Sequence, residues 1–137
     1  MTLTKRQRLR RLINDSNYPS RLGQELIGGS WILGSGWTEV GEDTGTYATD
    51  GTVGTLAQTV SVSTGKSYYL TLKAYAESVI TGLSVSLGSG TPVILKHSGS
   101  KGVKIVCGGG SDIVFSVLSA NDFIGDIKSI HLREILS

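Results

Sequence analysis

Apolar and polar residues alternate through most of the middle of this chain, from residue 56 to residue 76. The apolar residues occupy even positions on both sides of one turn, at Leu56, Val60, Val62, Tyr68, Leu70, Leu72, Ala74 and Ala76. Because successive side chains of a strand point to opposite faces, a period of two predicts half-buried strands. The sequence STGK between them supplies a turn, in which Gly65 is free to adopt a positive φ. We therefore expect two antiparallel strands, at 56–62 and 67–76, to form the central pair of a β-sandwich.

Short alternations of the same kind, separated by glycine turns, recur along the rest of the chain. They predict strands at residues 26–27, 31–33, 37–40, 44–49, 80–87, 93–96, 103–107, 113–117 and 126–135. The 19 glycines and only 2 prolines suit many short strands joined by turns. Eight to ten such strands, with no helix in the body, predict an all-β domain with a jelly-roll β-sandwich fold.

Three local features sharpen this prediction. In the last strand Ile127 lies on the opposite parity from Ile130, which predicts a bulge near residues 128–129. The sequence SGSKG at 98–102 lacks the full spacing of a phosphate-binding loop and is expected to be a hairpin turn. In the strand that ends at residue 87, Ser84 and Ser86 are expected to face outward.

The N-terminal segment has a different character and is expected to form a short helix at residues 3–14. Thr4 and Gln7 have the spacing of a capping box. Leu9, Leu12 and Ile13 form a narrow apolar stripe, surrounded by Lys5, Arg6, Arg8, Arg10 and Arg11. A helix of about three turns is marginal in water, so we expect this arm to become ordered against a partner. The predicted domains are therefore an anchoring arm at 1–22 and a β-sandwich at 23–137.

The net charge of +2 conceals a marked asymmetry between these two parts. Residues 1–22 hold six Lys and Arg against one Asp, a net charge of +5, whereas the remainder holds seven against ten acids, or −3. The arm has no aromatic residues interleaved with its basic ones, so binding to nucleic acid is not favoured over a solvated basic face. Docking onto a large acidic protein surface suits its arginines better, because Arg pairs with carboxylates in a bidentate manner.

No set of residues with catalytic or metal-binding spacing is evident. His97 and His131 are far apart and lack a Cys or His partner at the spacing of metal ligands. No nucleophile motif is present, and the single Cys107, in an apolar strand, is expected to be a buried small residue. No stretch approaches the ~20 apolar residues of a membrane span. We expect a non-enzymatic protein with no cofactor, no metal and no membrane association.

Aromatic side chains offer one route to ligand binding, since a sugar ring stacks on a flat aromatic face. The candidates are Trp31, Trp37, Tyr47, Tyr69 and Tyr75. Trp37, after a glycine turn, is expected in the core. Tyr69 and Tyr75 fall on the outward parity of their strand and are the residues predicted to contact a glycan, if one is bound.

Four stretches of the body resemble a known family. They are WTEV from Trp37, GTLAQTVSVSTGKSY from Gly54, ITGLSVSLG from Ile80 and DFIGDIKSIHL from Asp122. Over about residues 25–135 the chain is similar to the jelly-roll domain related to carbohydrate-binding modules, which recurs in virion proteins of tailed bacteriophages. The resemblance implies a fold that serves several roles: glycan binding, the outer part of a head or tail fibre, or capsid decoration.

The leading hypothesis from sequence is a non-enzymatic phage virion protein, a capsid decoration, cement or head-fibre protein. It would be assembled in the host cytoplasm and dock to the major capsid protein or another virion protein through its arm. A homotrimer would match the local threefold symmetry of capsid sites. Two alternatives stay open: a glycan-binding module on a tail or virion exterior, with a surface glycan as partner, and a small tail or baseplate component.

Overall fold

Eleven β-strands make up the regular structure of residues 21–40 and 45–136, the parts of the chain that the computed structural model describes. The strands are β1 (Leu22–Glu25), β2 (Ile32–Leu33), β3 (Trp37–Glu39), β4 (Thr46–Thr49), β5 (Gly54–Thr59), β6 (Ser67–Val79), β7 (Leu83–Leu87), β8 (Val93–Leu95), β9 (Gly99–Val106), β10 (Asp112–Val117) and β11 (Phe123–Ile135). Neither part contains a helix, and hence none of a length and apolarity that would cross a membrane. The prediction of an all-β body is confirmed.

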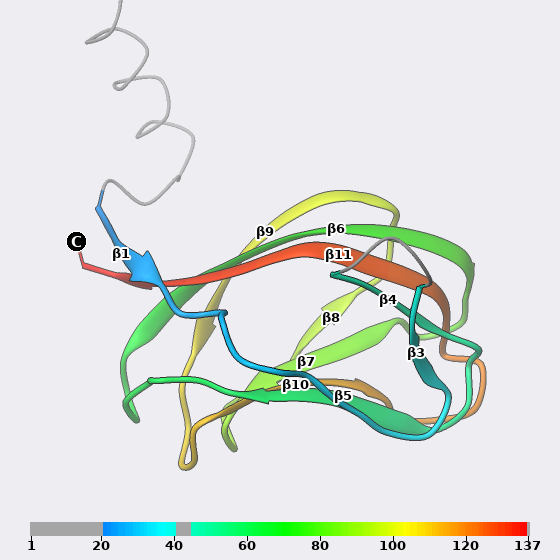
Figure 1. Cartoon of the computed structure of the whole chain (residues 1–137), viewed down its shortest axis with the longest axis horizontal. Helices are drawn as coiled ribbons and strands as arrows, with labels where there is room; N and C mark the ends of the chain where they lie inside the picture. Colours follow the sequence, from blue (N-terminus) through cyan, green and yellow to red (C-terminus); the bar gives the residue numbers. More distant parts are fainter. Residues whose placement is uncertain (1–20, 41–44, 137) are drawn as a thin grey trace, which may run out of the picture.

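The strands form two antiparallel sheets that lie face to face as two layers (Figure 1). Sheet A has the order β3-β4-β11-β6-β9, with β1 added beside β11, and sheet B has the order β2-β5-β10-β7-β8. The two longest strands, β6 and β11, pair with each other in the middle of sheet A. Their outward-facing side chains therefore occupy the middle of the outer face of that sheet.

The core fills the space between the inner faces of the two sheets. The alternation predicted that the even positions of β6 face the core. Leu70 and Leu72 at these positions are almost completely buried. Ile127 of the neighbouring strand β11 and Phe115 of β10 in the facing sheet are fully buried in the same cluster, and Trp37 is buried as predicted. Burying each such side chain contributes about 1.5–3 kcal/mol, so this cluster is the main stabilising element of the body.

The predicted central pair of strands is wrong. β5 pairs with β2 and β10 in sheet B, whereas β6 pairs with β9 and β11 in sheet A. The turn between them carries the chain from one sheet to the other, and Gly65 has the positive φ of 87° expected there. An alternating pattern shows which side chains share a face, and it is the same whichever strand lies alongside.

Two local predictions are also corrected, and a third is qualified. Residues 26–27 are not a strand: β1 ends at Glu25, and these two side chains pack against the edge of the core. Residues 98–102 are not a turn, since all but the first lie within β9. Ser84 follows the parity opposite to the core residues Leu83 and Val85, as predicted, but it is only 5% exposed and so is not open to solvent.

The predicted arm falls almost entirely outside the described residues. This holds for its helix at 3–14 and for the basic and apolar residues from Lys5 to Ile13 that were predicted to contact a partner. The predictions on the arm therefore stay predictions.

Candidate functional site

β11 contains a bulge between Lys128 and His131, where one of its two edges has no paired strand. β6 occupies one edge of β11, while the other edge is shared by β4, up to Lys128, and β1, from Arg133 onward. Between them the register shifts and Ser129 adopts a φ of 54°, which confirms the predicted bulge. Bulges redirect side chains and often lie beside binding sites. Here the bulge leaves an open place in sheet A between β4 and β1.

A hollow of about 550 Å³ occupies this place, and its lining includes Ile27, Trp31, Lys73, Lys128 and His131. A second hollow, of about 510 Å³, adjoins the first and shares residues of β6 and β11 with it. A third, of about 200 Å³, continues toward β1. The second and third hollows share Tyr69, Thr71 and His131. The outward face of sheet A thus carries a row of adjoining hollows along β6 and β11.

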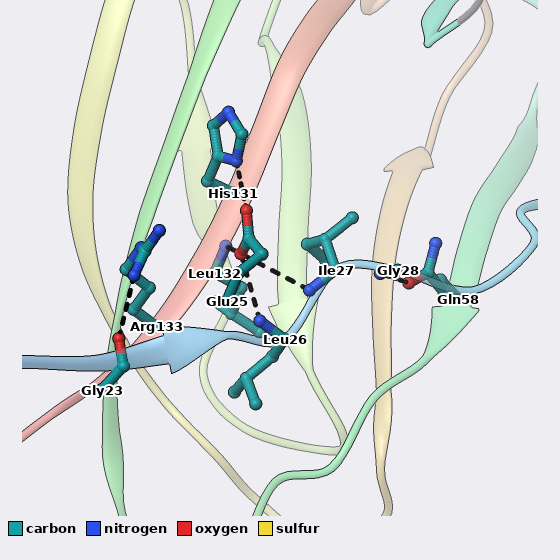
Figure 2. A network of polar contacts seen from close by, with 9 residues as sticks. All are labelled: Gly23, Glu25, Leu26, Ile27, Gly28, Gln58, His131, Leu132 and Arg133. Carbon is teal, nitrogen blue, oxygen red and sulfur yellow. Dashed lines mark hydrogen bonds and ion pairs between the residues drawn. The ribbon is translucent and has the colours of Figure 1, made fainter.

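The carboxylate of Glu25 fixes His131 at the centre of this row (Figure 2). One carboxylate oxygen contacts the imidazole Nδ1 of His131. The other accepts hydrogen bonds from the backbone N–H groups of Leu132 at 2.8 Å, Leu26 at 3.1 Å and Ile27 at 3.5 Å. A single side chain therefore joins the end of β1, the segment after it and the bulged part of β11.

The pKa of Glu25 reflects these contacts. Burial raises the pKa of the carboxyl, but the hydrogen bonds from His131, Leu132 and Ile27 outweigh it and hold the pKa below the usual 4.5. Glu25 is therefore ionised at neutral pH, and an ionised carboxylate only accepts hydrogen bonds. The Nδ1 of His131 must then carry a proton, and the ring's other nitrogen points away from Glu25 (Figure 2). That second nitrogen is available to a ligand.

Gln58 of β5 holds the segment that carries Ile27 and Trp31, two lining residues of the first hollow. Its side chain is buried, and its carbonyl oxygen accepts from the backbone N–H groups of Gly28 at 3.1 Å and Gly29 at 3.0 Å. Its amide nitrogen donates to the carbonyl of Gly29 at 3.0 Å. The segment that crosses from sheet A to sheet B is therefore pinned by Glu25 at its start and by Gln58 near its middle. This segment presents Ile27 and Trp31 to the hollow.

The aromatic candidates fall into two groups. Trp37 and Tyr47 are buried, and the Trp31 ring lies 5.8 Å from that of Tyr47 in a tilted arrangement. Tyr69 and Tyr75 lie on the outward face of β6, as their parity predicted. Tyr69 is half-buried and lines the second and third hollows, whereas Tyr75 is 60% exposed and lines none of the three. Tyr69 is thus the better placed of the two predicted contacts.

The sequence prediction missed His131, Lys73 and Lys128. Both lysines follow the outward parity of their strands, but their proximity depends on the pairing of β6 with β11, which the sequence did not reveal. His131 gave no local signal, because its partner Glu25 is 106 residues away. Gln58 did give one: it interrupts the apolar even positions between Leu56 and Val60, and a polar residue on a buried face needs a hydrogen-bond partner.

Two other features bear on metal binding and on thiol chemistry in the part of the chain that the structure describes. There, no three His, Cys, Asp or Glu side chains lie together in a way that could hold a metal ion. Cys107 is buried, as predicted, and its thiol donates to the carbonyl of Gly108 at 3.1 Å. Burial raises the pKa of this thiol, which keeps it protonated and unreactive.

No protein family and no curated protein sequence matches this chain. Among solved structures it is similar to an exo-β-1,3-galactanase from Phanerochaete chrysosporium crystallised with galactose, at 21% identity and a TM-score of 0.50. The same galactanase in a complex with β-1,3-galactotriose matches at 19% identity and a TM-score of 0.46. Each match covers 80% of this chain but only 27% of the galactanase. The first similarity shows that this chain shares its β fold with part of a larger protein.

Proposed function

We propose that the body of this protein is a non-catalytic glycan-binding module with jelly-roll topology. The observation that carries the proposal is the row of hollows on the outward face of sheet A, where Tyr69 lies beside His131. A sugar ring stacks on an aromatic face, and its hydroxyl groups need hydrogen-bonding partners at the edge. Glu25 holds the His131 ring through Nδ1, so His131 supplies its second ring nitrogen. Thr71, which lies opposite His131 on β6, supplies a hydroxyl in the same hollow.

The fold supports the same proposal more weakly. The similar galactanase was crystallised with galactose, and the matched part is a minor share of its length. A fold of this kind serves many roles, so the choice of a glycan rests on the chemistry of the face and not on the neighbour.

A glycan array probed with the full chain tests this proposal. We expect a selective signal that the Tyr69→Ala substitution reduces by about tenfold, because stacking on a tyrosine contributes about 1 kcal/mol or more. Tyr75→Ala is the matched control: it removes the same ring from the same face of β6, away from the hollows. An array with no selective signal, or one in which both variants match the wild type, would contradict the proposal.

A second role is supported by the charge asymmetry of the sequence. We propose that the chain is a structural protein of a phage virion, a capsid decoration or head-fibre protein, attached through the basic residues of its arm. Residues 1–22 carry a net charge of +5, whereas residues 23–137 carry −3, so the arm is the part suited to an acidic protein surface. The two proposals are compatible, since a module held on a particle can still present its sheet to a glycan.

Deletion of residues 1–20 tests this second role while leaving β1 intact. We expect the truncated protein to keep the β-sheet circular dichroism of the full chain and to lose association with particles. A truncated protein that still co-purifies with heads or tails at full occupancy would defeat the attachment model.

A further inference from the structure

A pair of lysines faces each other on the outward face of sheet A. Lys73 of β6 lies directly opposite Lys128 of β11, and both are exposed and line the first hollow. Two ion pairs are present among the described residues, Lys66–Glu134 and His131–Glu25, so neither lysine of the facing pair has a carboxylate partner there. Directly opposed like charges destabilise an antiparallel sheet. This arrangement is unfavourable for folding by itself and favourable for holding an anion.

The basic residues of the body are gathered on the same sheet. Residues 23–137 contain Lys66, Lys73, Lys96, Lys101, Lys104, Lys128 and Arg133, and five of these seven lie on β6, β9 or β11. The three strands lie side by side in sheet A (Figure 1). Their acids are Glu77, Asp126 and Glu134, the last of which is already paired with Lys66. Lys101 and Glu134 follow the buried parity of Leu72 and Tyr68, so the outward positions of these strands carry Lys73, Lys104, Lys128 and Arg133 against Glu77 and Asp126. The Glu25 carboxylate on the same face is paired with His131. A body that carries a net negative charge therefore presents one face with a local excess of positive charge.

Two of these cations flank the aromatic ring of the proposed site. Tyr69 lies opposite Lys104 of β9 on one side and opposite Arg133 of β11 on the other. The guanidinium of Arg133 donates to the carbonyl of Gly23 at 3.1 Å and is held in place (Figure 2). Lys73 lies four positions along β6 from Tyr69, which is about 13 Å of strand. The positive charge thus extends along the row of hollows and matches a polymer better than a single sugar.

We infer that this face binds an acidic polysaccharide, with Lys73 and Lys128 receiving its carboxylate groups. The inference rests on the proposed glycan-binding function and specifies its ligand class. Tyr69 would stack on a sugar ring while the lysine pair neutralises an acidic group farther along the chain. Carboxylate groups spaced along a glycan complement an arrangement of separate point charges, which is what lysines provide.

A nucleic acid is the less suitable polyanion for this face. A nucleic acid carries a charge on every phosphate, and electrostatic attraction dominates its affinity, which favours a protein domain of net positive charge. Residues 23–137 carry a net charge of −3.

Calorimetric titration of the full chain with polygalacturonate, with neutral β-1,3-galactan and with oligo-dT tests the inference. We expect polygalacturonate to bind most tightly and to bind more weakly as the ionic strength rises. The double substitution Lys73→Gln with Lys128→Gln should lower its affinity by about tenfold, since each exposed charge contact contributes a few-fold. Arg10→Gln with Arg11→Gln removes the same charge from the arm, and Lys96→Gln removes one after β8 of sheet B. Both controls should change the affinity less than threefold, roughly.

Each contrary outcome has its own meaning. Equal losses in the arm variant and the lysine variant would overturn the inference, because binding would then follow total charge. Galactan bound as tightly as polygalacturonate, unaffected by the lysine substitutions but lost in Tyr69→Ala, would overturn the acidic ligand and leave the glycan-binding function intact. Oligo-dT bound more tightly than polygalacturonate through the same lysines would assign the face to nucleic acid. No binding to either glycan would overturn both proposals.

Discussion

Removal of the Glu25 carboxylate should loosen the N-terminal strand and the bulge of β11 together. In Glu25→Ala the partly buried backbone N–H of Leu132 loses its acceptor at 2.8 Å, and those of Leu26 and Ile27 lose theirs. Hydrogen bonds to a charged group contribute about 1.5–3 kcal/mol when one partner is left unpaired. Water can reach the latter two groups, so we count the first in full and expect a total loss of about 2–3 kcal/mol.

Thermal unfolding followed by calorimetry measures this loss. For a domain of this size each kcal/mol shifts Tm by about 3–5 °C, so Glu25→Ala should lower Tm by roughly 10 °C. Glu25→Gln is the matched control, because its amide oxygen can still accept from Leu132 and its nitrogen can face His131. We expect about 1 kcal/mol for the loss of charge alone. A Tm for Glu25→Ala within about 2 °C of the wild type would refute the reasoning.

The pH dependence of the same variants gives an independent check. The pKa of Glu25 is lowered in the folded protein from its usual 4.5, so the folded state favours the ionised form. This contribution to the free energy of unfolding is complete above that value and is lost as the pH falls from 4.5 through the lower pKa of the folded state. The stability advantage of the wild type over Glu25→Gln should therefore shrink on acidification below pH 4.5. A difference that stays constant or grows there would contradict the ionised, hydrogen-bonded carboxylate.

Three further substitutions examine other parts of the site. Gln58→Leu leaves the backbone groups of Gly28 and Gly29 unpaired and should cost about 2–4 kcal/mol in urea unfolding; a loss below 1 kcal/mol, roughly, would mean that Gln58 does not pin the segment. A Cβ at residue 102 would overlap the Tyr69 hydroxyl, so Gly102→Ala should reduce glycan binding with little change in Tm, whereas unchanged binding would move the ligand away from that ring. Lys128→Gln relieves the repulsion with Lys73 and should raise the free energy of unfolding by a few tenths of a kcal/mol; a clear decrease would show that the two ammonium groups do not oppose each other.

Sequence alone predicted the features that depend on a strand's own alternation. The outward positions of Tyr69 and Tyr75, the burial of Leu70 and the bulge that follows Lys128 all come from parity along one strand. A side chain's face is a local property of an extended backbone, and so it can be inferred without knowing the neighbouring strand.

The features that depend on which strands pair with each other could not be predicted from the sequence. The chain between β5 and β6 crosses from one sheet to the other, and nothing in a period of two distinguishes that crossing from a hairpin. The same limit hid the meeting of Lys73 with Lys128 and of Glu25 with His131, which bring together residues far apart in the sequence. The candidate site consists almost wholly of such long-range pairs, while the core consists of residues whose burial follows from the alternation along a single strand.

The place where the chain enters the fold determines how the two proposed roles would share sheet A. The backbone N–H of Leu136 donates to the carbonyl of Arg21 at 3.0 Å, so any segment before residue 21 joins the body beside the end of β11. That end of sheet A carries Arg133 and Tyr69, whereas the Lys73–Lys128 pair lies farther along the same strands. A particle bound through the arm would lie nearer to Tyr69 than to the lysine pair, so docking would obstruct the tyrosine contact before the lysine contacts. Polygalacturonate binding by particle-bound protein should then keep its dependence on the lysines; its loss on docking would show that the attachment surface and the glycan face overlap.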